Sequence, residues 1–319
     1  MSRNEYAVRV VAAEQLTPTI KRVRMVARDG QALPPYSAGA HTVLSLPCPD
    51  RIIRNAYSLL GSTLGGGAYE VAVLRTPHSR GGSAFVHDHI AEGTELTVSA
   101  PVNLFSLHRR ARHHVLVAGG IGITPITAMA EELAKAGASF ELHYALRSET
   151  LGAFAAELPA RFGQRVRLYA SERQERLHIH DIIRHQPIGT HLYVCGPERL
   201  IDMVLGDAAA AGWPSSSLHA ERFLAPAGGE PFTVRLARAG VTAEVGEDET
   251  LLEAIERSGV DAPYSCRGGV CGECELGVVS AEGTLDHRDH YLSPEAKAEG
   301  GKIMPCVSRL KGRELVLDL

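Results

Sequence analysis

Four cysteines near the C-terminal end of the sequence constrain the fold of this chain more than any other feature. Cys266, Cys271 and Cys274 follow the spacing C-x4-C-x2-C, and 31 residues (275–305) separate them from Cys306. This is the ligand spacing of a plant-type [2Fe–2S] cluster, in which each of two irons needs two thiolates. The sequence therefore predicts that these four cysteines are metal ligands and that three of them lie on one tight loop.

The residues between the cysteines suit such a loop. Gly268, Gly269 and Gly272 have no Cβ atom, so the backbone can adopt positive φ and approach the sulfurs closely. Backbone N–H groups in a loop of this kind can hydrogen-bond the sulfurs and tune the reduction potential.

Three other cysteine chemistries compete with the cluster. Cys271 and Cys274 alone match a C-x2-C dithiol redox pair, but such pairs belong near a βαβ unit, and these do not. Four cysteines can hold zinc, although structural zinc sites usually pair two C-x2-C motifs. Disulfides need an oxidising compartment. The spacing favours the iron–sulfur cluster over all three.

The composition indicates a soluble globular protein with two or three domains. The chain has 319 residues, of which 45% are hydrophobic and 22% are charged. It contains no run of 18 apolar residues, and residues 1–6 lack the apolar core of a signal peptide. We therefore expect a cytoplasmic protein that does not span a membrane. Cys48 and Cys195, outside the motif, are expected to be free thiols.

The net charge of −4 is distributed unevenly along the chain. Residues 1–108 carry 10 Lys+Arg against 8 Asp+Glu, residues 109–230 carry 13 against 13, and residues 231–319 carry 10 against 16. The excess of acid lies with the cysteine motif, which argues against nucleic-acid binding and favours attraction to a basic protein surface. Solubility alone is an equally simple explanation.

The first third of the chain has the pattern of a small antiparallel β-barrel. Short stretches of alternating apolar residues are separated by turns that contain glycine or proline. The expected strands are a hairpin over residues 5–28 and single strands at 41–46, 55–60, 69–74 and 95–98.

Two stretches of this barrel predict a phosphorylated aromatic ligand. In residues 54–59 (RNAYSL), an aromatic ring and a hydroxyl on one strand can flank a planar ring and bond its polar edge. In residues 79–87 (SRGGSAFVH), paired glycines before a helix expose backbone N–H groups to an anion, and Arg80 adds a positive charge. Taken singly, the first could be an ordinary strand and the second a surface turn.

The middle of the chain has the pattern of a nucleotide-binding sheet. Residues 114–118 (HVLVA) form an apolar run typical of a buried parallel strand, and GGIGITP follows at 119–125. Thr124 suits an N-cap and Pro125 the first position of a helix that should run to about residue 136, with Gly137 as its stop. Strand, glycine turn and helix form a phosphate cradle, although the glycines depart from a strict G-x-G-x-x-G.

Alternating elements continue to residue 211 and predict a parallel sheet. The expected strands are 141–145, 166–170 and 192–195, and the expected helices are 149–158, 179–185 and 198–211. Cys195, Gly196 and Pro197 end a strand at the edge where open α/β sheets bind ligands, unless Cys195 is simply a packing residue.

The last segment has the order of a small α+β ferredoxin domain. After a linker within residues 221–230, we expect a hairpin over 232–236 and 241–245, a capped helix over 250–258 ended by Gly259, and then the cysteine loop. The sequence thus predicts three domains. They are a β-barrel (1–108), an α/β domain (109–224) and, after a linker (225–230), an iron–sulfur domain (231–319).

The order of these domains and their motifs resembles the phthalate dioxygenase reductase family over nearly the whole chain. The cysteine motif is highly specific, and YSL at 57–59 with RGGS at 80–83 is moderately so. The resemblance implies FMN in the antiparallel barrel, NADH in the α/β domain and a [2Fe–2S] cluster in a ferredoxin-like domain of the β-grasp type. It also implies a terminal oxygenase as partner, usually of the Rieske type.

The resemblance also implies roles for individual residues. Tyr57 should lie against the isoalloxazine ring, Ser58 near its N5 edge, and Phe223 beside the flavin where the nicotinamide arrives. Ser58, Cys195 and Phe223 are therefore the candidates nearest the reacting atoms. The flavin contacts are expected at Asn55, Ala56, Tyr57, Ser58, Val73, Leu74, Arg75, Arg80, Gly81, Gly82 and Ser83, and the nucleotide contacts at Gly120, Thr124, Cys195, Gly196, Pro197 and Phe223.

One position departs from the family pattern. The family commonly has arginine two residues before the tyrosine, where this sequence has Asn55. Arg54 is adjacent but points the other way on a strand. Asn55 can still donate a hydrogen bond, while Arg75 or Arg80 supplies charge for the flavin phosphate.

The choice of nucleotide rests on a different residue. Glu172 follows the strand 166–170, and its carboxylate can bond a ribose 2′-OH and repel a 2′-phosphate, which favours NADH over NADPH. Arg147 and Ser148 argue the other way, since arginine suits phosphate.

The implied function follows from the number of electrons each cofactor exchanges. NADH releases two electrons together, as hydride to flavin N5, whereas a [2Fe–2S] cluster accepts one, so a flavin is expected between them. The partner should dock near the acidic ferredoxin domain. Two alternatives stay open: the same reductase serving a haem monooxygenase, and a non-catalytic carrier or zinc-binding protein with a decayed reductase.

Overall fold

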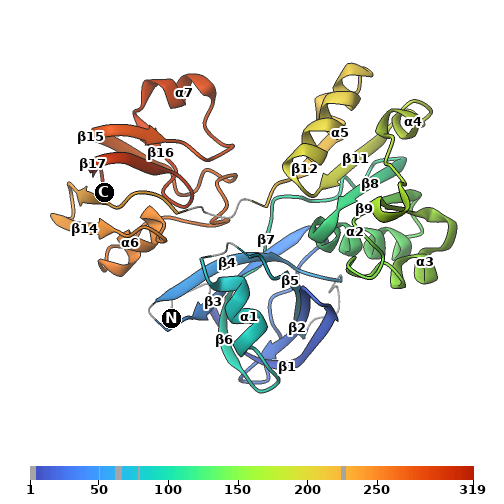
Figure 1. Cartoon of the computed structure of the whole chain (residues 1–319), viewed down its shortest axis with the longest axis horizontal. Helices are drawn as coiled ribbons and strands as arrows, with labels where there is room; N and C mark the ends of the chain where they lie inside the picture. Colours follow the sequence, from blue (N-terminus) through green and yellow to red (C-terminus); the bar gives the residue numbers. More distant parts are fainter. Residues whose placement is uncertain (1–4, 50, 62–66, 78–79, 224–227) are drawn as a thin grey trace. The chain divides into compact units, whose positions relative to one another are not determined.

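The chain divides into two compact units. The structure, a computed structural model, describes residues 5–49, 51–61, 67–77, 80–223 and 228–319 (Figure 1). One unit comprises Met1–Pro77 and Gly81–Phe223, and the other comprises His78–Arg80 and Leu224–Leu319. Half of the linker predicted at residues 225–230, namely 225–227, lies outside the described residues.

The first unit begins with a seven-stranded antiparallel sheet. Its strand order is β4-β3-β6-β1-β2-β5, with β7 beside β3. Because β4 and β5, at the two ends of this order, also contact each other, the sheet curves into the predicted barrel. Its elements are β1 (Glu5–Thr17), β2 (Ile20–Ala27), β3 (Ala40–Pro47), β4 (Ile52–Ser58), β5 (Ala68–Leu74), α1 (Gly82–His89), β6 (Glu95–Ser99) and β7 (Val102–Asn103).

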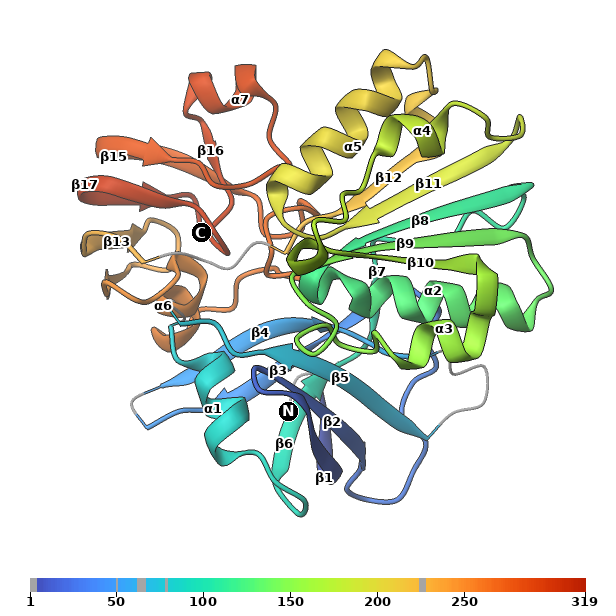
Figure 2. The ribbon, with the colours of Figure 1, turned by 45° about the vertical axis from the view of Figure 1, so that its right-hand side comes forward.

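The same unit continues as a five-stranded parallel sheet in the order β10-β9-β8-β11-β12. Helices α2 and α3 cover one face, and α4 and α5 cover the other (Figure 2). Strand β8 is apolar throughout because Leu116 packs on the α2 side and Val115 on the α4 and α5 side. The elements are β8 (His113–Gly119), α2 (Ile123–Lys135), β9 (Phe140–Leu146), α3 (Glu157–Phe162), β10 (Val166–Ala170), α4 (Ile179–Ile183), β11 (Thr190–Cys195), α5 (Glu198–Ala210) and β12 (Leu218–Glu221).

Two predicted helix starts in this sheet were wrong. Thr124 and Pro125 are not the N-cap and first residue of α2, because a 3₁₀ turn, η1 (Gly120–Gly122), leads directly into a helix that begins at Ile123. The helix expected over 149–158 is replaced by turns, and α3 begins only at Glu157. Phe154 adopts φ +60°, which a right-handed helix cannot pass through. Three further 3₁₀ turns are η2 (Gly163–Arg165), η3 (Ser171–Arg173) and η4 (Ser215–Ser217).

The second unit is a mixed five-stranded sheet with two helices, as expected for a ferredoxin-like α+β fold. Its strand order is β14-β13-β17-β15-β16, and only the β13–β17 pair is parallel. Thr250 and Glu253 form a capping box at the start of α6, and Gly259 follows its end with φ +81°. The elements are β13 (Phe232–Leu236), β14 (Val241–Val245), α6 (Leu251–Arg257), β15 (Leu276–Asp286), α7 (Pro294–Glu299), β16 (Lys302–Ile303) and β17 (Arg309–Leu317).

Within the described ranges, none of the helices is long and apolar enough to cross a membrane. The three-domain boundaries drawn from the sequence remain predictions.

Candidate functional site

The four motif cysteines lie together as two pairs. The Sγ atoms of Cys274 and Cys306 are 3.3 Å apart, and Cys266 and Cys271 also hydrogen-bond each other. Two neighbouring pairs fit a cluster of two irons that each need two thiolates. Among the residues that the structure describes, no group of three or more Cys, His, Asp or Glu is placed to hold a single metal ion.

The Cys266–Cys271 pair favours a thiolate on Cys266. The hydrogen bond from Cys271, assisted by backbone N–H groups of Val270 and Gly268, lowers the pKa of Cys266 to about 5. The same contact raises the pKa of Cys271. Since thiolate is the form that binds iron, the loop offers at least one ligand in its reactive state near neutral pH.

Two of the three glycines of the cysteine loop, Gly269 and Gly272, are required by close packing. Gly272 has φ +84°, and a Cβ there would lie 2.3 Å from the ring of Tyr291. Gly269 has φ +70°, and its Cβ would lie 2.6 Å from Val307. Gly268 does not need positive φ, contrary to expectation; its backbone N donates to Cys266 Sγ at 3.3 Å. The third left-handed residue is Arg267, with φ +51°, which the sequence analysis missed.

The candidate flavin residues on β4 meet the glycine turn at the start of α1. Asn55 Nδ2 donates to the hydroxyl of Tyr57 at 3.3 Å. The same nitrogen lies 2.4 Å from the position that a Cβ on Gly82 would take, so any larger residue there would displace the amide of Asn55. Asn55 thus places a neutral amide at the turn that the sequence predicts to hold the flavin phosphate. Burial raises the pKa of Tyr57 to about 12, so its hydroxyl stays protonated.

Two buried polar atoms next to Tyr57 have no hydrogen-bond partner among the residues that the structure describes. They are Ser58 Oγ and Nε2 of His41, whose residues are 6% and 7% exposed. His41 and Ser58 are cross-strand partners of β3 and β4, so their side chains share one face of the sheet. Buried polar groups are normally paired, so this face suits a ligand with a polar edge, such as a flavin. Burial lowers the pKa of His41 to about 4, so it is neutral at pH 7. Sequence reasoning missed His41, since an alternating strand with one histidine carries no signal.

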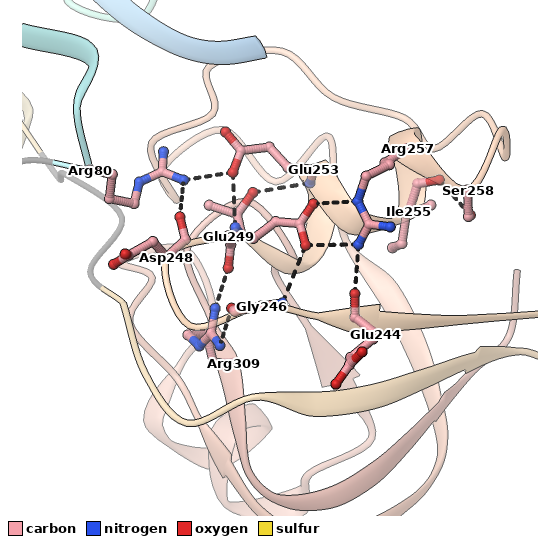
Figure 3. Close-up of polar contacts among 11 residues, drawn as sticks. Arg80, Glu244, Gly246, Asp248, Glu249, Glu253, Ile255, Arg257, Ser258 and Arg309 are labelled. Atoms are coloured by element: carbon pink, nitrogen blue, oxygen red, sulfur yellow. Dashed lines mark hydrogen bonds and ion pairs between the residues drawn. The ribbon is translucent and has the colours of Figure 1, made fainter. Parts of the chain in front are cut away.

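The cations proposed for the flavin phosphate each already bind a carboxylate. Arg75 pairs with Asp88 at 2.5 Å. Arg80 lies in the second unit, where Nη1 donates to Glu253 Oε2 at 2.6 Å and to the carbonyl of Asp248 at 3.3 Å (Figure 3). Their predicted contacts to phosphate are therefore additional to these ion pairs.

The glycine turn itself has the conformation of an anion cradle. Gly81 is the N-cap of α1 with φ +105°, a left-handed conformation in which glycine is unstrained. The hydroxyl of Ser83 faces Thr76, with Oγ accepting from its backbone N at 3.2 Å. Among the remaining flavin candidates, Ala56 is exposed, Leu74 is half-buried, and Val73 is buried with its carbonyl 2.9 Å from His87 Nε2.

The candidate nucleotide residues meet at the carboxyl ends of β8 and β11. A Cβ on Gly122 would lie 2.4 Å from the carbonyl oxygen of Cys195, and one on Gly196 would lie 2.9 Å from Gly119. The two loops therefore touch backbone to backbone, which brings Gly120 and Pro197 to one edge of the sheet. Thr124 is buried and donates to the carbonyl of Ile121 at 3.0 Å.

A buried carboxylate at this edge was missed by sequence reasoning. Residues 218–221 were assigned partly to a linker, but they form β12, in which Glu221 pairs with Cys195 of β11. Glu221 is half-buried, and its Oε2 is buried without a partner in the described part of the chain. Burial raises the pKa of Glu221 to about 8 and holds the pKa of the fully buried Cys195 thiol well above its ordinary value. Phe223, two residues later, is 45% exposed.

Glu172 and Arg147 are neighbours at the same edge of the parallel sheet. The backbone N of Glu172, in η3, donates to the carbonyl of Arg147 at 3.1 Å. Glu172 is exposed, as a residue that contacts a ribose must be, and its role remains a prediction.

Comparison with known proteins agrees with this geometry. Residues 234–311 match the family model described as "2Fe-2S iron-sulfur cluster binding domain". Residues 98–218 match "Dimethylamine monooxygenase subunit DmmA-like, N-terminal domain". Over 99% of this chain and 98% of the other, the structure of phthalate dioxygenase reductase superposes with a TM-score of 0.90 at 35% identity. The chain belongs to the phthalate dioxygenase reductase family.

Curated relatives of similar length carry related names. The chain is 45% identical to the "Heme-dependent oxidative N-demethylase beta subunit" of Ectopseudomonas mendocina over 98% of both chains. It is 43% identical to the "Carnitine monooxygenase reductase subunit" of Acinetobacter pittii over 96% of this chain and 100% of the other. It is 36% identical to the "Vanillate O-demethylase oxidoreductase" of Acinetobacter baylyi over 96% of both chains.

These comparisons decide between the classes of function left open by the sequence. The chain is an oxidoreductase of the kind that serves oxygenase systems, with a pyridine-nucleotide site, a flavin site and a [2Fe–2S] domain, and it passes electrons in that order. The alternative of a zinc-binding protein or a carrier with a decayed reductase is not supported.

Proposed function

We propose that this chain takes electrons from NADH through FMN and its [2Fe–2S] cluster and delivers them to a terminal oxygenase that acts on a small N-methylated amine. The observation that carries the substrate class is the 45% identity, over 98% of both chains, to a subunit named for oxidative N-demethylation. The carnitine monooxygenase relative and the match of residues 98–218 to a dimethylamine monooxygenase family support it.

Two classes of acceptor fit this proposal. The resemblance implies an oxygenase of the Rieske type. A haem-containing oxygenase is the second candidate, because the 45% identical relative is named as part of a haem-dependent system. The chain's own residues serve both equally, since the cluster is the donor in each case.

The residues described above would each serve one cofactor. Flavin, when bound, accepts hydride and gives up single electrons, which joins the two ends of the chain. The turn at Gly81 and Gly82 with the amide of Asn55 would hold the FMN phosphate, and Ser58 with His41 would bond the polar edge of the ring. The glycine turn after β8 would hold the pyrophosphate of NADH.

The oxygenase is proposed to dock on the surface of the cysteine loop rather than along α6. The acids of α6 are engaged inside the unit: Glu253 pairs with Arg80, and Glu256 pairs with Arg267. On the cysteine loop, Glu273 is exposed, and Val270 is 39% exposed. An exposed apolar residue with an acidic neighbour fits a transient partner that carries a basic rim.

One experiment tests the proposed acceptor and substrate together. The reductase is mixed anaerobically with a candidate oxygenase of each class, one haem-containing and one of the Rieske type, and NADH is added. We expect the oxygenase to become reduced and, in air, to release formaldehyde from an N-methyl substrate. A Soret shift or the bleaching of a Rieske spectrum identifies the acceptor. Failure with N-methylated amines but turnover of an aromatic methyl ether such as vanillate would contradict the substrate class.

A second experiment tests the docking surface. Electrostatic attraction mainly raises the association rate and weakens as salt shortens the Debye length to about 8–10 Å. We expect Glu273→Lys to slow electron delivery to the oxygenase, and Glu247→Lys, at an exposed acid before α6, to leave it unchanged. Reduction of the flavin by NADH is the control. An equal effect of the two substitutions on electron delivery would contradict docking at the cysteine loop. The acidic residues would then serve only solubility.

A further inference from the structure

Arg267 is an unusual residue for the position that it holds in the cysteine loop. It follows the ligand Cys266 directly, yet it is only 7% exposed. Its φ of +51° lies in the left-handed region, where residues other than glycine, asparagine and aspartate are strained. A buried cation in a strained backbone conformation persists only where its surroundings hold it.

The surroundings of Arg267 do hold it, through helix α6. Nη1 donates to Glu256 Oε2 at 3.1 Å, and Nη2 donates to the other oxygen of the same carboxylate. The guanidinium also lies over the ring of Tyr264, 3.9 Å from its centroid. The side chains of Arg267 and Glu256 are 5% and 17% exposed, so this two-pronged ion pair is shielded from water.

One donor of the same guanidinium has no acceptor. Nε of Arg267 is buried and lacks a hydrogen-bond partner within the described residues. The cation is therefore held in place by Glu256 and Tyr264 but is not fully satisfied by the protein. Because Arg267 follows the ligand Cys266 directly in the chain, a buried charged donor without an acceptor points to a negatively charged group held by this loop.

We propose that the Arg267–Glu256 pair positions the cysteine loop and sets the reduction potential of the [2Fe–2S] cluster. Reduction adds one negative charge to the cluster. The guanidinium favours the reduced form, the carboxylate opposes it, and the pair keeps the two in balance. The inference depends on the cluster and not on the identity of the oxygenase.

Because Arg267 and Glu256 carry opposite charges, removing one or the other should shift the reduction potential of the cluster in opposite directions. Glu256→Gln leaves the buried guanidinium uncompensated, so the cluster should become easier to reduce. Arg267→Gln leaves the carboxylate uncompensated, so the cluster should become harder to reduce. A merely structural role for the pair would move both variants in the same direction, because each breaks the same contact.

The test is a redox titration of the full-length holoprotein, with the cluster followed by electron paramagnetic resonance. At a fixed solution potential we expect the ratio of reduced to oxidised cluster to rise at least threefold in Glu256→Gln and to fall at least threefold in Arg267→Gln. Threefold corresponds to about 28 mV, given 59 mV per tenfold change for one electron. The flavin titration in the same samples should stay unchanged.

A second pair in the same unit gives the matched control. Glu249 also forms an ion pair with an arginine of α6, Arg257, at 2.8 Å, but Arg257 is 56% exposed. Arg257→Gln should therefore leave the potential of the cluster unchanged. If Arg267→Gln assembles no cluster, Arg267→Gly replaces it, since glycine accepts φ +51° without strain and also removes the charge.

The outcomes divide cleanly. Opposite shifts in the Glu256 and Arg267 variants, with none in Arg257→Gln, support the proposal. Loss of iron and sulfide from the Glu256 and Arg267 variants, with full occupancy in Arg257→Gln, supports the positioning role. Full occupancy with unchanged potentials would overturn the proposal, and shifts of equal sign in both variants would overturn the claim that the charges of this pair set the reduction potential.

Discussion

The ion pair between Arg80 and Glu253 gives the sharpest stability prediction (Figure 3). The two side chains are 9% and 7% exposed, and removing one partner of a buried pair costs about 3–5 kcal/mol because the other charge is left uncompensated. Glu253→Gln is the informative change, since glutamine can still complete the capping box with Thr250 and only the charge is lost. Arg80 also donates to the carbonyl of Asp248, so we expect a loss near the lower end, about 3 kcal/mol.

A loss of this size is easy to measure. For a unit of roughly a hundred residues, 1 kcal/mol shifts Tm by about 4–8 °C, so the expected fall is about 12–24 °C. The assay heats the full-length protein at one fixed scan rate and follows the visible circular dichroism of the cluster, because loss of the cluster makes unfolding irreversible.

The control and the double variant decide the cause. Glu247→Gln changes an exposed acid in the loop before α6 and should move Tm by little, as surface substitutions do. Removing both charges, in Arg80→Gln with Glu253→Gln, should restore part of the loss because no buried charge is left alone. Equal Tm values for Glu253→Gln and Glu247→Gln would refute the reasoning.

Three further predictions concern the cofactor sites. Cys306→Ser should abolish or weaken [2Fe–2S] assembly while NADH still reduces the flavin; normal iron content in this variant would contradict the ligand assignment. Because the pKa of Glu221 is raised from 4.5 to about 8 by burial, the native state binds its proton more tightly, and this side chain makes stability fall by up to about 1.4 kcal/mol per pH unit between those values. Glu221→Gln removes this pH dependence. The free energy of unfolding of the variant relative to the wild type, measured in urea, should therefore rise from pH 6 to pH 8. A difference in this free energy that stays constant with pH would argue against a buried proton on Glu221. NADH should give a higher kcat/KM than NADPH, and Glu172→Ala should narrow that ratio, whereas a ratio that stays the same would exclude Glu172 as the selector.

The sequence predicted the elements whose signals are local. The apolar run of β8, the stop at Gly137 and the capped helix α6 were confirmed, because turn residues and hydrophobic period determine them. The helix expected at 149–158 was wrong because no local pattern shows that Phe154 takes φ +60°. Strand β12 was missed for a similar reason, since its four residues form a strand only by pairing with β11.

The candidate site divides in the same way. The cysteine spacing predicted the ligands, since the chemistry of two irons requires that pattern, and their assignment stays a prediction. No sequence signal marked three residues of the candidate site, because the neighbour of each lies on a different element of the chain. His41 lies opposite Ser58 of β4, Glu221 lies opposite Cys195 of β11, and Arg267 pairs with Glu256 of α6. The sequence also cannot show that Glu253 and Glu256 are paired with buried arginines, because those arginines lie outside α6, which carries both acids.

The most direct test of the central claim is an anaerobic titration of the purified protein with NADH, followed by visible absorption and electron paramagnetic resonance. We predict that the flavin bands bleach and that the signal of a reduced [2Fe–2S] cluster appears in the same samples. In Cys306→Ser only the flavin bands should bleach. Flavin that bleaches while an intact cluster stays oxidised, or a protein that binds no flavin, would contradict electron transfer from the nucleotide to the cluster.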